Sequence, residues 1–277
     1  MGMRITTNMA AISAQKNMVG SQREIQKSMT QLASGSRITK SADDAAGLAI
    51  SENLKSQTRS LLQAGRNAND GISLIQVAEG GLGEISNILT RLRELGIQSS
   101  SDTVADRERV LINRETQQLT AEVERIAKTT KFGTQHLLDG TGATYDFQVG
   151  IYNNSAEDRI SFDASEANAT AGSLGVDSFD FSTKEGAQDA LSVLDEAQTR
   201  VSSFRANLGA LQNRMQSTVE NTSTQYENLM AANARIRDTD VAAASSEMTR
   251  NNVLLQASTA TLSQANQLPG LALKLIG

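Results

Sequence analysis

The sequence predicts a mainly α-helical fold: a long antiparallel helical bundle or coiled coil with a small β-hairpin region, in which the terminal helices form an inner coiled-coil layer. Three observations support this prediction. The 277 residues include one proline, whereas average usage near 5% would give about 14, so long helices can run without interruption. Apolar residues recur every seven positions along most of the chain. Seven of the nine aromatic residues lie within residues 131–182.

The two ends of the chain are poor in charge and predict amphipathic terminal helices. No acidic residue precedes Glu24, and Lys274 is the only charged residue after Arg250. Both ends are still patterned, which a disordered tail would not be. Near the N-terminus, Ile5, Met9, Ile12 and Val19 lie at helical spacing. A second set, Ile25, Met29 and Leu32, follows one position out of phase with them. We interpret the main apolar positions as a self-assembly seam, formed by Ile5, Met9, Ile12, Val19, Met248, Leu255 and Leu262.

Three further helices are predicted between the ends. Gly35 can end the first helix as a C-cap. Ser41-Ala42-Asp43-Asp44 resembles a capping box that opens a helix over about 41–99, and about 55 helical residues would extend roughly 80 Å. Helices over about 103–129 and 183–237 follow, the last opened by a second capping box at 182–185.

The aromatic-rich segment predicts a small β region at about 131–182. Tyr145, Phe147 and Val149 alternate with polar residues, as do Ile160 and Phe162. This alternation favours a hairpin, with glycine and asparagine in the turns.

The domain organisation follows from this order of elements. We expect an inner terminal-helix domain of residues 1–40 with 238–277, and an outer rod domain of residues 41–237 that includes the β region. Ordering about 30 residues costs roughly 1–2 kcal/mol each for the backbone. We therefore expect the ends to be disordered in the isolated subunit and to become helical when neighbouring subunits cover them.

Composition excludes several kinds of chemistry. A chain without cysteine has no disulfide, zinc ribbon, iron–sulfur cluster or thiol nucleophile, and His136 alone cannot anchor a typical transition-metal site. A pI near 5.1 argues against nucleic-acid binding, and no apolar run predicts a membrane span or an ordinary secretory signal. We expect no catalytic, cofactor-binding or metal-binding residue. Asp43-Asp44 and Asp238-Thr239-Asp240 are interpreted as helix caps, and the glycines within 79–83 as sites of close helix packing.

Several motifs resemble those of a known family. Leu32-Ala33-Ser34-Gly35-Ser36-Arg37-Ile38 and the following Ala42-Asp43-Asp44-Ala45-Ala46-Gly47-Leu48-Ala49-Ile50-Ser51 are similar to the N-terminal signature of bacterial flagellins. So is Arg66-Asn67-Ala68-Asn69-Asp70-Gly71-Ile72-Ser73-Leu74. Gln264-Ala265-Asn266-Gln267-Leu268-Pro269 resembles the C-terminal signature. The resemblance covers about 1–140 and 185–277.

The resemblance implies a structural subunit, not an enzyme, that self-assembles into the extracellular bacterial flagellar filament for swimming motility. It implies a short form without variable outer domains, secreted unfolded by type III export. A hook–filament junction protein is the alternative, and an enzyme or a soluble coiled-coil signalling protein is a more distant one. The partners it implies are further copies of the chain, the filament cap protein, hook–filament junction proteins and an export chaperone, with no nucleic acid and no membrane.

The resemblance also implies two kinds of surface site. Toll-like receptor 5 of vertebrates recognises flagellins, and Arg91, Leu95 and Glu115 match the recognised segment. Flagellins are often O-glycosylated in their outer region, and the candidate residues here are Ser155, Ser165 and Thr170.

Overall fold

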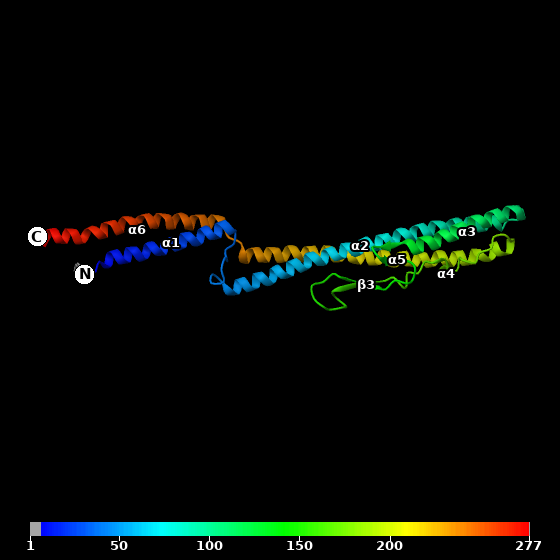
Figure 1. The fold of residues 1–277 in the computed structure, drawn as a ribbon, viewed down its shortest axis with the longest axis horizontal. Helices are drawn as coiled ribbons and strands as arrows, with labels where there is room; N and C mark the ends of the chain where they lie inside the picture. Colours follow the sequence, from blue (N-terminus) through cyan, green and yellow to red (C-terminus); the bar gives the residue numbers. More distant parts are fainter. Residues whose placement is uncertain (1–6, 277) are drawn as a thin grey trace. The chain divides into compact units, whose positions relative to one another are not determined.

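The structure, a computed structural model, describes residues 7–276, and it describes the side chains of residues 7–267. Ile5 of the predicted seam therefore lies outside the described residues. The elements are, in order, α1 (Met9–Ser34), α2 (Ala45–Ser99), α3 (Asp106–Thr129), β1 (Lys131–Phe132), β2 (Gln135–His136), β3 (Thr144–Gln148), β4 (Arg159–Asp163), α4 (Ala171–Leu174), α5 (Lys184–Arg237) and α6 (Val241–Ile276) (Figure 1). The predicted fold class is confirmed.

The predicted helix starts differ from the observed ones by four residues at α2, three at α3 and one at α5. Asp44 is the N-cap of α2, because its Oδ1 accepts a hydrogen bond from the backbone N of Gly47 at 2.8 Å; Ser41 lies outside the helix because Asp43 instead binds back to Thr39 and Lys40. At α5 the cap is Thr183, whose Oγ1 accepts from the backbone N of Gly186 at 3.2 Å. A side-chain acceptor three residues before a backbone donor is the usual N-cap arrangement.

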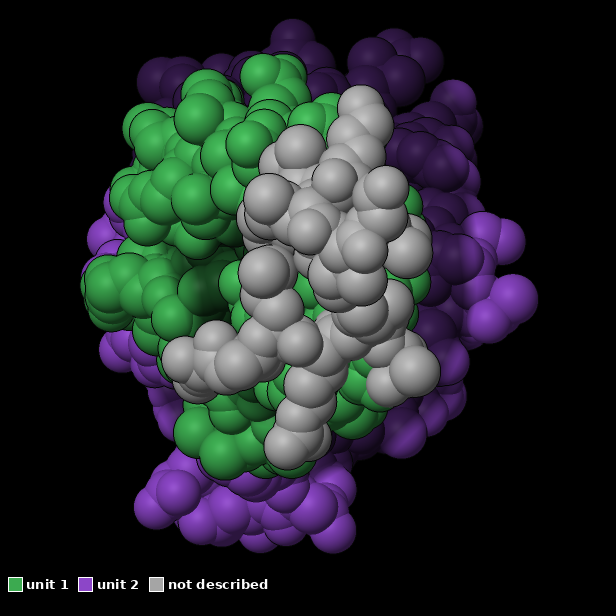
Figure 2. Space-filling model, turned by 90° about the vertical axis from the view of Figure 1, so that its left-hand side faces the viewer, with its two compact units in different colours: residues 1–56, 228–277 green, residues 57–227 purple. Residues whose placement is uncertain are grey.

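The chain divides into two compact units, which Figure 2 colours separately. Unit 1 comprises residues 1–56 and 228–277, and unit 2 comprises residues 57–227. The division predicted from the sequence, after residues 40 and 237, concerns layers of an assembly and stays a prediction.

In unit 1, α1 and α6 lie side by side and run in opposite directions (Figure 1). Asn8 Nδ2 donates to the carbonyl of Ala265 at 2.7 Å near one end of the pair. Ser36 and Asp238 form an antiparallel β-bridge at the other end. Gly35 closes α1 with a φ of 69°, as predicted for a C-cap. These contacts bring the two charge-poor ends of the chain together.

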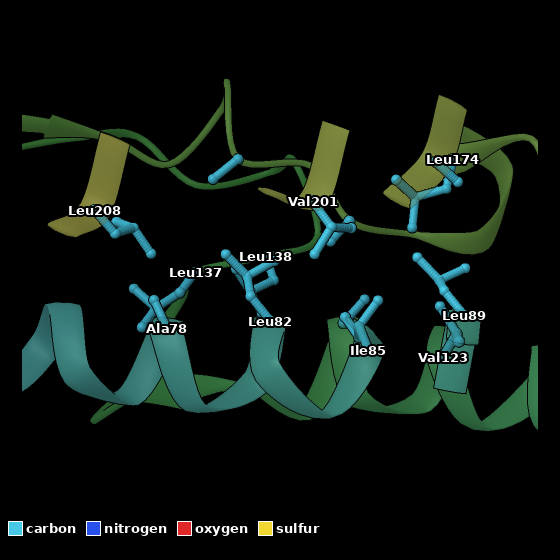
Figure 3. Packing of buried hydrophobic residues seen from close by; sticks show 14 of the residues in the cluster. Ala78, Leu82, Ile85, Leu89, Val123, Leu137, Leu138, Leu174, Val201 and Leu208 are labelled. Carbon is cyan, nitrogen blue, oxygen red and sulfur yellow. The ribbon is translucent and has the colours of Figure 1, made fainter. Parts of the chain in front are cut away.

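In unit 2, the long helices and the β region enclose one hydrophobic core. Leu82 of α2 points toward Val201 of α5, with Leu138 packed between them, and Leu89 of α2 points toward Leu174 of α4 (Figure 3). Strand β3 pairs antiparallel with β4, so the predicted hairpin is confirmed, and Phe162 is buried against the core. Large aliphatic side chains at seven-residue steps of α2 and α5 thus form the helical side of the core, as expected for helical seams, and many residues of 137–181 complete it.

One glycine of the 79–83 segment allows close packing of this core. A Cβ added at Gly81 would lie 2.7 Å from Thr130 Oγ1 and 2.9 Å from Leu138 Cδ1, whereas one added at Gly80 or Gly83 would meet nothing within 4 Å. The packing interpretation therefore holds for Gly81 alone of the three.

Candidate self-assembly interface

The contact between α1 and α6 is a heptad seam in which large and small residues alternate. The large positions, all half-buried, are Met18, Ile25 and Leu32 on α1 and Met248, Leu255 and Leu262 on α6. The small or polar positions are Ala14, Ser21 and Ser28 on α1 and Ala244, Asn251 and Ser258 on α6. Because Asn8 lies against Ala265 and Ser36 against Asp238, Met18 is level with Leu255 and Ile25 with Met248. Apolar layers thus alternate with small, polar layers.

Polar side chains in this seam are largely removed from solvent. Ser28 is 4% exposed and Asn251 is 6% exposed. Asn251 Nδ2 donates to Glu247 Oε1 of its own helix at 3.3 Å. The predicted seam did not include these residues, because it was drawn from apolar positions only. Their spacing is the signal that could have found them, since they occupy the second position of the same heptads.

The predicted seam residues fall on two different faces. Met248, Leu255 and Leu262 lie in the contact with α1. Met9, Ile12 and Val19 are instead 65%, 51% and 43% exposed and do not contribute to the pair. On α1 the contact uses Ile25 and Leu32 of the second apolar set, together with small residues, whereas Met29 of that set is 58% exposed. The first set forms an exposed apolar face, and we call Met9, Ile12 and Val19 the open face of α1.

Helix α6 has exposed apolar side chains of its own. Val241, Val253 and Leu254 are 62%, 59% and 47% exposed. At about 100° per residue, these three side chains point to different sides of α6, and exposed apolar residues scattered singly are ordinary. The open face of α1 is therefore the apolar surface that remains outside the mutual contact.

The structure brings Arg91 and Glu115 together, and it places Leu95 elsewhere. Arg91 Nη2 lies 2.9 Å from Glu115 Oε1, and the two side chains are 49% and 46% exposed. The hydrogen bonds that Arg91 donates to the carboxylates of Glu115 and then Glu94 raise its pKa above the usual value. Leu95 is 2% exposed and belongs to the core of unit 2. The ion pair is thus a surface feature, and Leu95 supports the helix beneath it.

The three candidate glycosylation residues differ in accessibility. Ser155 and Ser165 are exposed, and Ser165 Oγ donates to Asp163 Oδ1 at 2.6 Å. Thr170 is half-buried and caps α4, because its Oγ1 accepts from the backbone N of Ser173 at 3.4 Å while donating to Asn168 Oδ1 at 2.8 Å. The first two hydroxyls are the more accessible to a modifying enzyme.

Other features of the described residues offer no reactive group. His136, the last residue of β2, is exposed, and its Nδ1 lies 3.0 Å from the carbonyl oxygen of Lys128 and 3.4 Å from Asp139 Oδ2. Within residues 7–267, no three acidic, histidine or cysteine side chains come together in a way that could hold a metal ion. None of the helices described is long and apolar enough to cross a membrane.

The protein has long heptad helices, paired ends and an open apolar face on α1. These features define a helical structural protein that associates with other chains. Comparison with known proteins identifies the family. The family profile "Bacterial flagellin N-terminal helical region" matches residues 5–143, and "Bacterial flagellin C-terminal helical region" matches residues 191–276. The flagellin of Halalkalibacterium halodurans is 46% identical over 274 residues, covering 99% of this chain and 100% of its own.

A second relative and a solved structure agree. The flagellin of Bacillus subtilis (strain 168) is 41% identical over 308 aligned positions, covering 99% of this chain and 100% of its own. The crystal structure of Bacillus cereus flagellin matches with a TM-score of 0.51 at 28% identity, covering 61% of this chain and 94% of that one. The chain belongs to the bacterial flagellin family. It is a structural subunit of the flagellar filament, which lies outside the cell, and not an enzyme. No match favours a hook–filament junction protein.

Proposed function

We propose that this flagellin builds its filament through the terminal helix pair, with the open face of α1 as the contact between neighbouring subunits. The observation that carries the proposal is the exposure of Met9, Ile12 and Val19 beside a seam that is already occupied by α6. Because about half of each side chain is still exposed, covering all three would contribute about 2–5 kcal/mol per subunit. The scarcity of charge on the outer faces keeps like-charge repulsion low when copies stack.

The same seam accounts for folding that depends on assembly. Alternate layers consist of Ala, Ser and Asn, so the pair buries less apolar surface than a leucine-rich coiled coil of equal length. We propose that the pair gains its stability when neighbouring subunits cover it. In this proposal residues 1–40 and 238–277 form the inner layer of the filament, and residues 41–237 form the outer rod.

Other partners can be assigned to the open face of α1 and to exposed residues of unit 2. An apolar face that is open before assembly needs a cover during export and at the growing tip, which suits an export chaperone, the filament cap protein and hook–filament junction proteins. Toll-like receptor 5 would contact Arg91 and Glu115 directly, while Leu95 would act by holding the helix. Ser155 and Ser165 are favoured over Thr170 for O-glycosylation because they are exposed.

Truncation tests the proposal. Deleting residues 255–277 removes half of the seam and should abolish polymerisation, while residues 57–227 stay helical and protease-resistant. A matched control, Gln256→Ala in the full chain, changes an exposed residue of α6 and should polymerise normally. Filaments of normal yield from the truncated chain would contradict the proposal.

A further inference from the structure

The alternating layers of the seam between α1 and α6 do not by themselves define one register, although a slip would break one hydrogen bond at the far end of the pair, from Asn8 Nδ2 to the carbonyl of Ala265. Large positions recur every seven residues on both helices, and small positions recur every seven residues between them. If α1 slides by one heptad, Ile25 becomes level with Leu255 where Met18 stood, and Ser28 becomes level with Asn251 where Ser21 stood. Every large layer remains large and every small layer remains small. A repeat of this kind specifies the face of each helix but not the axial position.

A separate set of hydrogen bonds fixes the axial position of α1 relative to α6 at the connector end of the pair. The backbone N of Arg37 donates to the carbonyl of Arg237 at 2.6 Å, and the backbone N of Thr239 donates to the carbonyl of Gly35 at 3.0 Å. These two antiparallel hydrogen bonds join the connector that follows α1 to the connector that precedes α6. We call residues 35–37 with 236–239 the connector bridge.

The side chain of Arg37 reinforces the connector bridge. Its Nη2 donates to the carbonyl of Ile236 at 2.7 Å, which is one of the last carbonyls of α5 and has no intrahelical partner by rule. The carbonyl of Arg37 in turn accepts from Gln31 Nε2 at 2.8 Å. One residue therefore ties the end of α1 to the end of α5 through its N–H, its carbonyl and its guanidinium.

The connector that follows α1 is long enough to permit a slip. Residues 35–44 are held compactly, since Ile38 is only 3% exposed and Asp43 Oδ2 accepts from the backbone N of Thr39 and of Lys40 at 3.1 and 3.0 Å. Ten residues can extend over about 33–36 Å, whereas a slip of one heptad moves a helix by about 10 Å. The contour length of the connector thus exceeds the displacement that one slip requires.

We propose that the connector bridge, with Arg37 as its positioning residue, selects one register of an otherwise degenerate terminal seam. Opening the bridge lets α1 slide along α6 in steps of seven residues, away from the connector. The proposal rests on the proposed function only where it concerns the filament, because the seam and the bridge both lie within unit 1 of one chain.

Engineered disulfides can read the register, since the chain has no cysteine of its own. The native reporter carries Ala14→Cys with Ser258→Cys, and the slipped reporter carries Ser21→Cys with Ser258→Cys; all three are small seam positions. Each reporter is copolymerised as a minor component with excess wild-type chain. Filaments then form even if the variant polymerises poorly on its own. After oxidation, intrachain disulfides are counted in the dissolved monomer by mass.

With an intact bridge, the native reporter should crosslink and the slipped reporter should not. Arg37→Ala and Thr239→Pro, which removes one backbone donor, should each raise the slipped-to-native ratio about tenfold, the effect of losing one strong hydrogen bond. The controls Arg23→Ala and Thr239→Ala, which keep the bridge, should leave the ratio unchanged. Arg37→Lys should restore part of the native ratio, because an ammonium can still donate to Ile236.

Two results would overturn the proposal: a ratio in Arg37→Ala equal to that in Arg23→Ala, or equal crosslinking of both reporters in the chain with an intact bridge. Failure of the proposed function is distinguishable. It would appear as normal filament yield from the open-face variant Ile12→Gln with Val19→Gln. The crosslink ratio could still be measured in wild-type filaments.

Discussion

Arg91 and Glu115 face each other across helices α2 and α3, with Nε and Nη2 of Arg91 lying 3.1 and 2.9 Å from the same oxygen of Glu115. Nη1 of Arg91 also donates to Glu94 Oε2 at 3.0 Å. Exposed ion pairs contribute little to stability because water and salt screen them. The arrangement therefore presents fixed charge on the surface of unit 2 without being needed for the fold.

Substitutions at this surface distinguish residues that contact the receptor from a residue that only supports the helix. Arg91→Ala and Glu115→Ala should each reduce activation of cells that express Toll-like receptor 5, while thermal unfolding of the protein hardly changes. Leu95→Ala should also reduce activation, but with a loss of about 2–5 kcal/mol in the free energy of unfolding, because Leu95 is 2% exposed. Unchanged activation by both charge variants would remove the receptor assignment.

Adjacent glycines of α2 should respond oppositely to alanine. Gly81→Ala places a Cβ 2.9 Å from Leu138 Cδ1, and we expect a loss of about 1–3 kcal/mol from overpacking. Gly80→Ala adds a methyl group in open space and should stabilise the helix by about 0.5–1 kcal/mol. Thermal unfolding of the two variants checks the sign of each effect. Equal shifts would contradict the packing described for Gly81.

Acid should loosen the connector of residues 39–43. The backbone N–H of Lys40, and then the hydroxyl and N–H of Thr39, lower the pKa of Asp43. A lowered folded-state pKa contributes stability that is present above the unfolded value near 3.9 and is lost as pH falls through the folded value. The protection of the amides of residues 39–43 from hydrogen exchange, relative to the intrinsic rate at each pH, should therefore fall below about pH 4.

The variant Asp43→Asn identifies the group responsible. It should abolish most of this acid dependence, while the exposed Asp70→Asn should preserve it. An acid response of residues 39–43 that is the same in all three proteins would show that another group controls the connector.

Helices and their faces could be predicted from the sequence wherever one period dominates. The strict heptads of α2 and α5 predicted a core that contains Leu82, Leu89 and Val201. Helix ends were less predictable, because Asp43 and Asp44 are both good caps and only the fold of the connector decides that Asp44 caps α2. Arg109 illustrates a further limit: it is 8% exposed and donates to the carbonyls of Ser99 and Ser101 at 2.9 Å each, a tertiary role that no local pattern indicates.

The candidate interface was predictable in part. Apolar periodicity identified Met248, Leu255 and Leu262, but it could not assign Met9, Ile12 and Val19 to a different face, because two apolar sets on α1 compete for one partner. The set that contains Ile25 and Leu32 is flanked by Ala, Ser and Met at heptad positions and allows close approach of α6. That choice depends on side-chain volume across both helices, which a single-helix pattern does not contain.

Electron microscopy of polymerised protein tests the central claim most directly. Ile12→Gln with Val19→Gln changes the open face of α1 and leaves its seam residues intact. The control Ile12→Leu with Val19→Ile keeps the face apolar. The account predicts filaments of normal yield from the control and few or none from the glutamine variant, with unit 2 equally folded in both. Filaments of equal yield from the two proteins would contradict it.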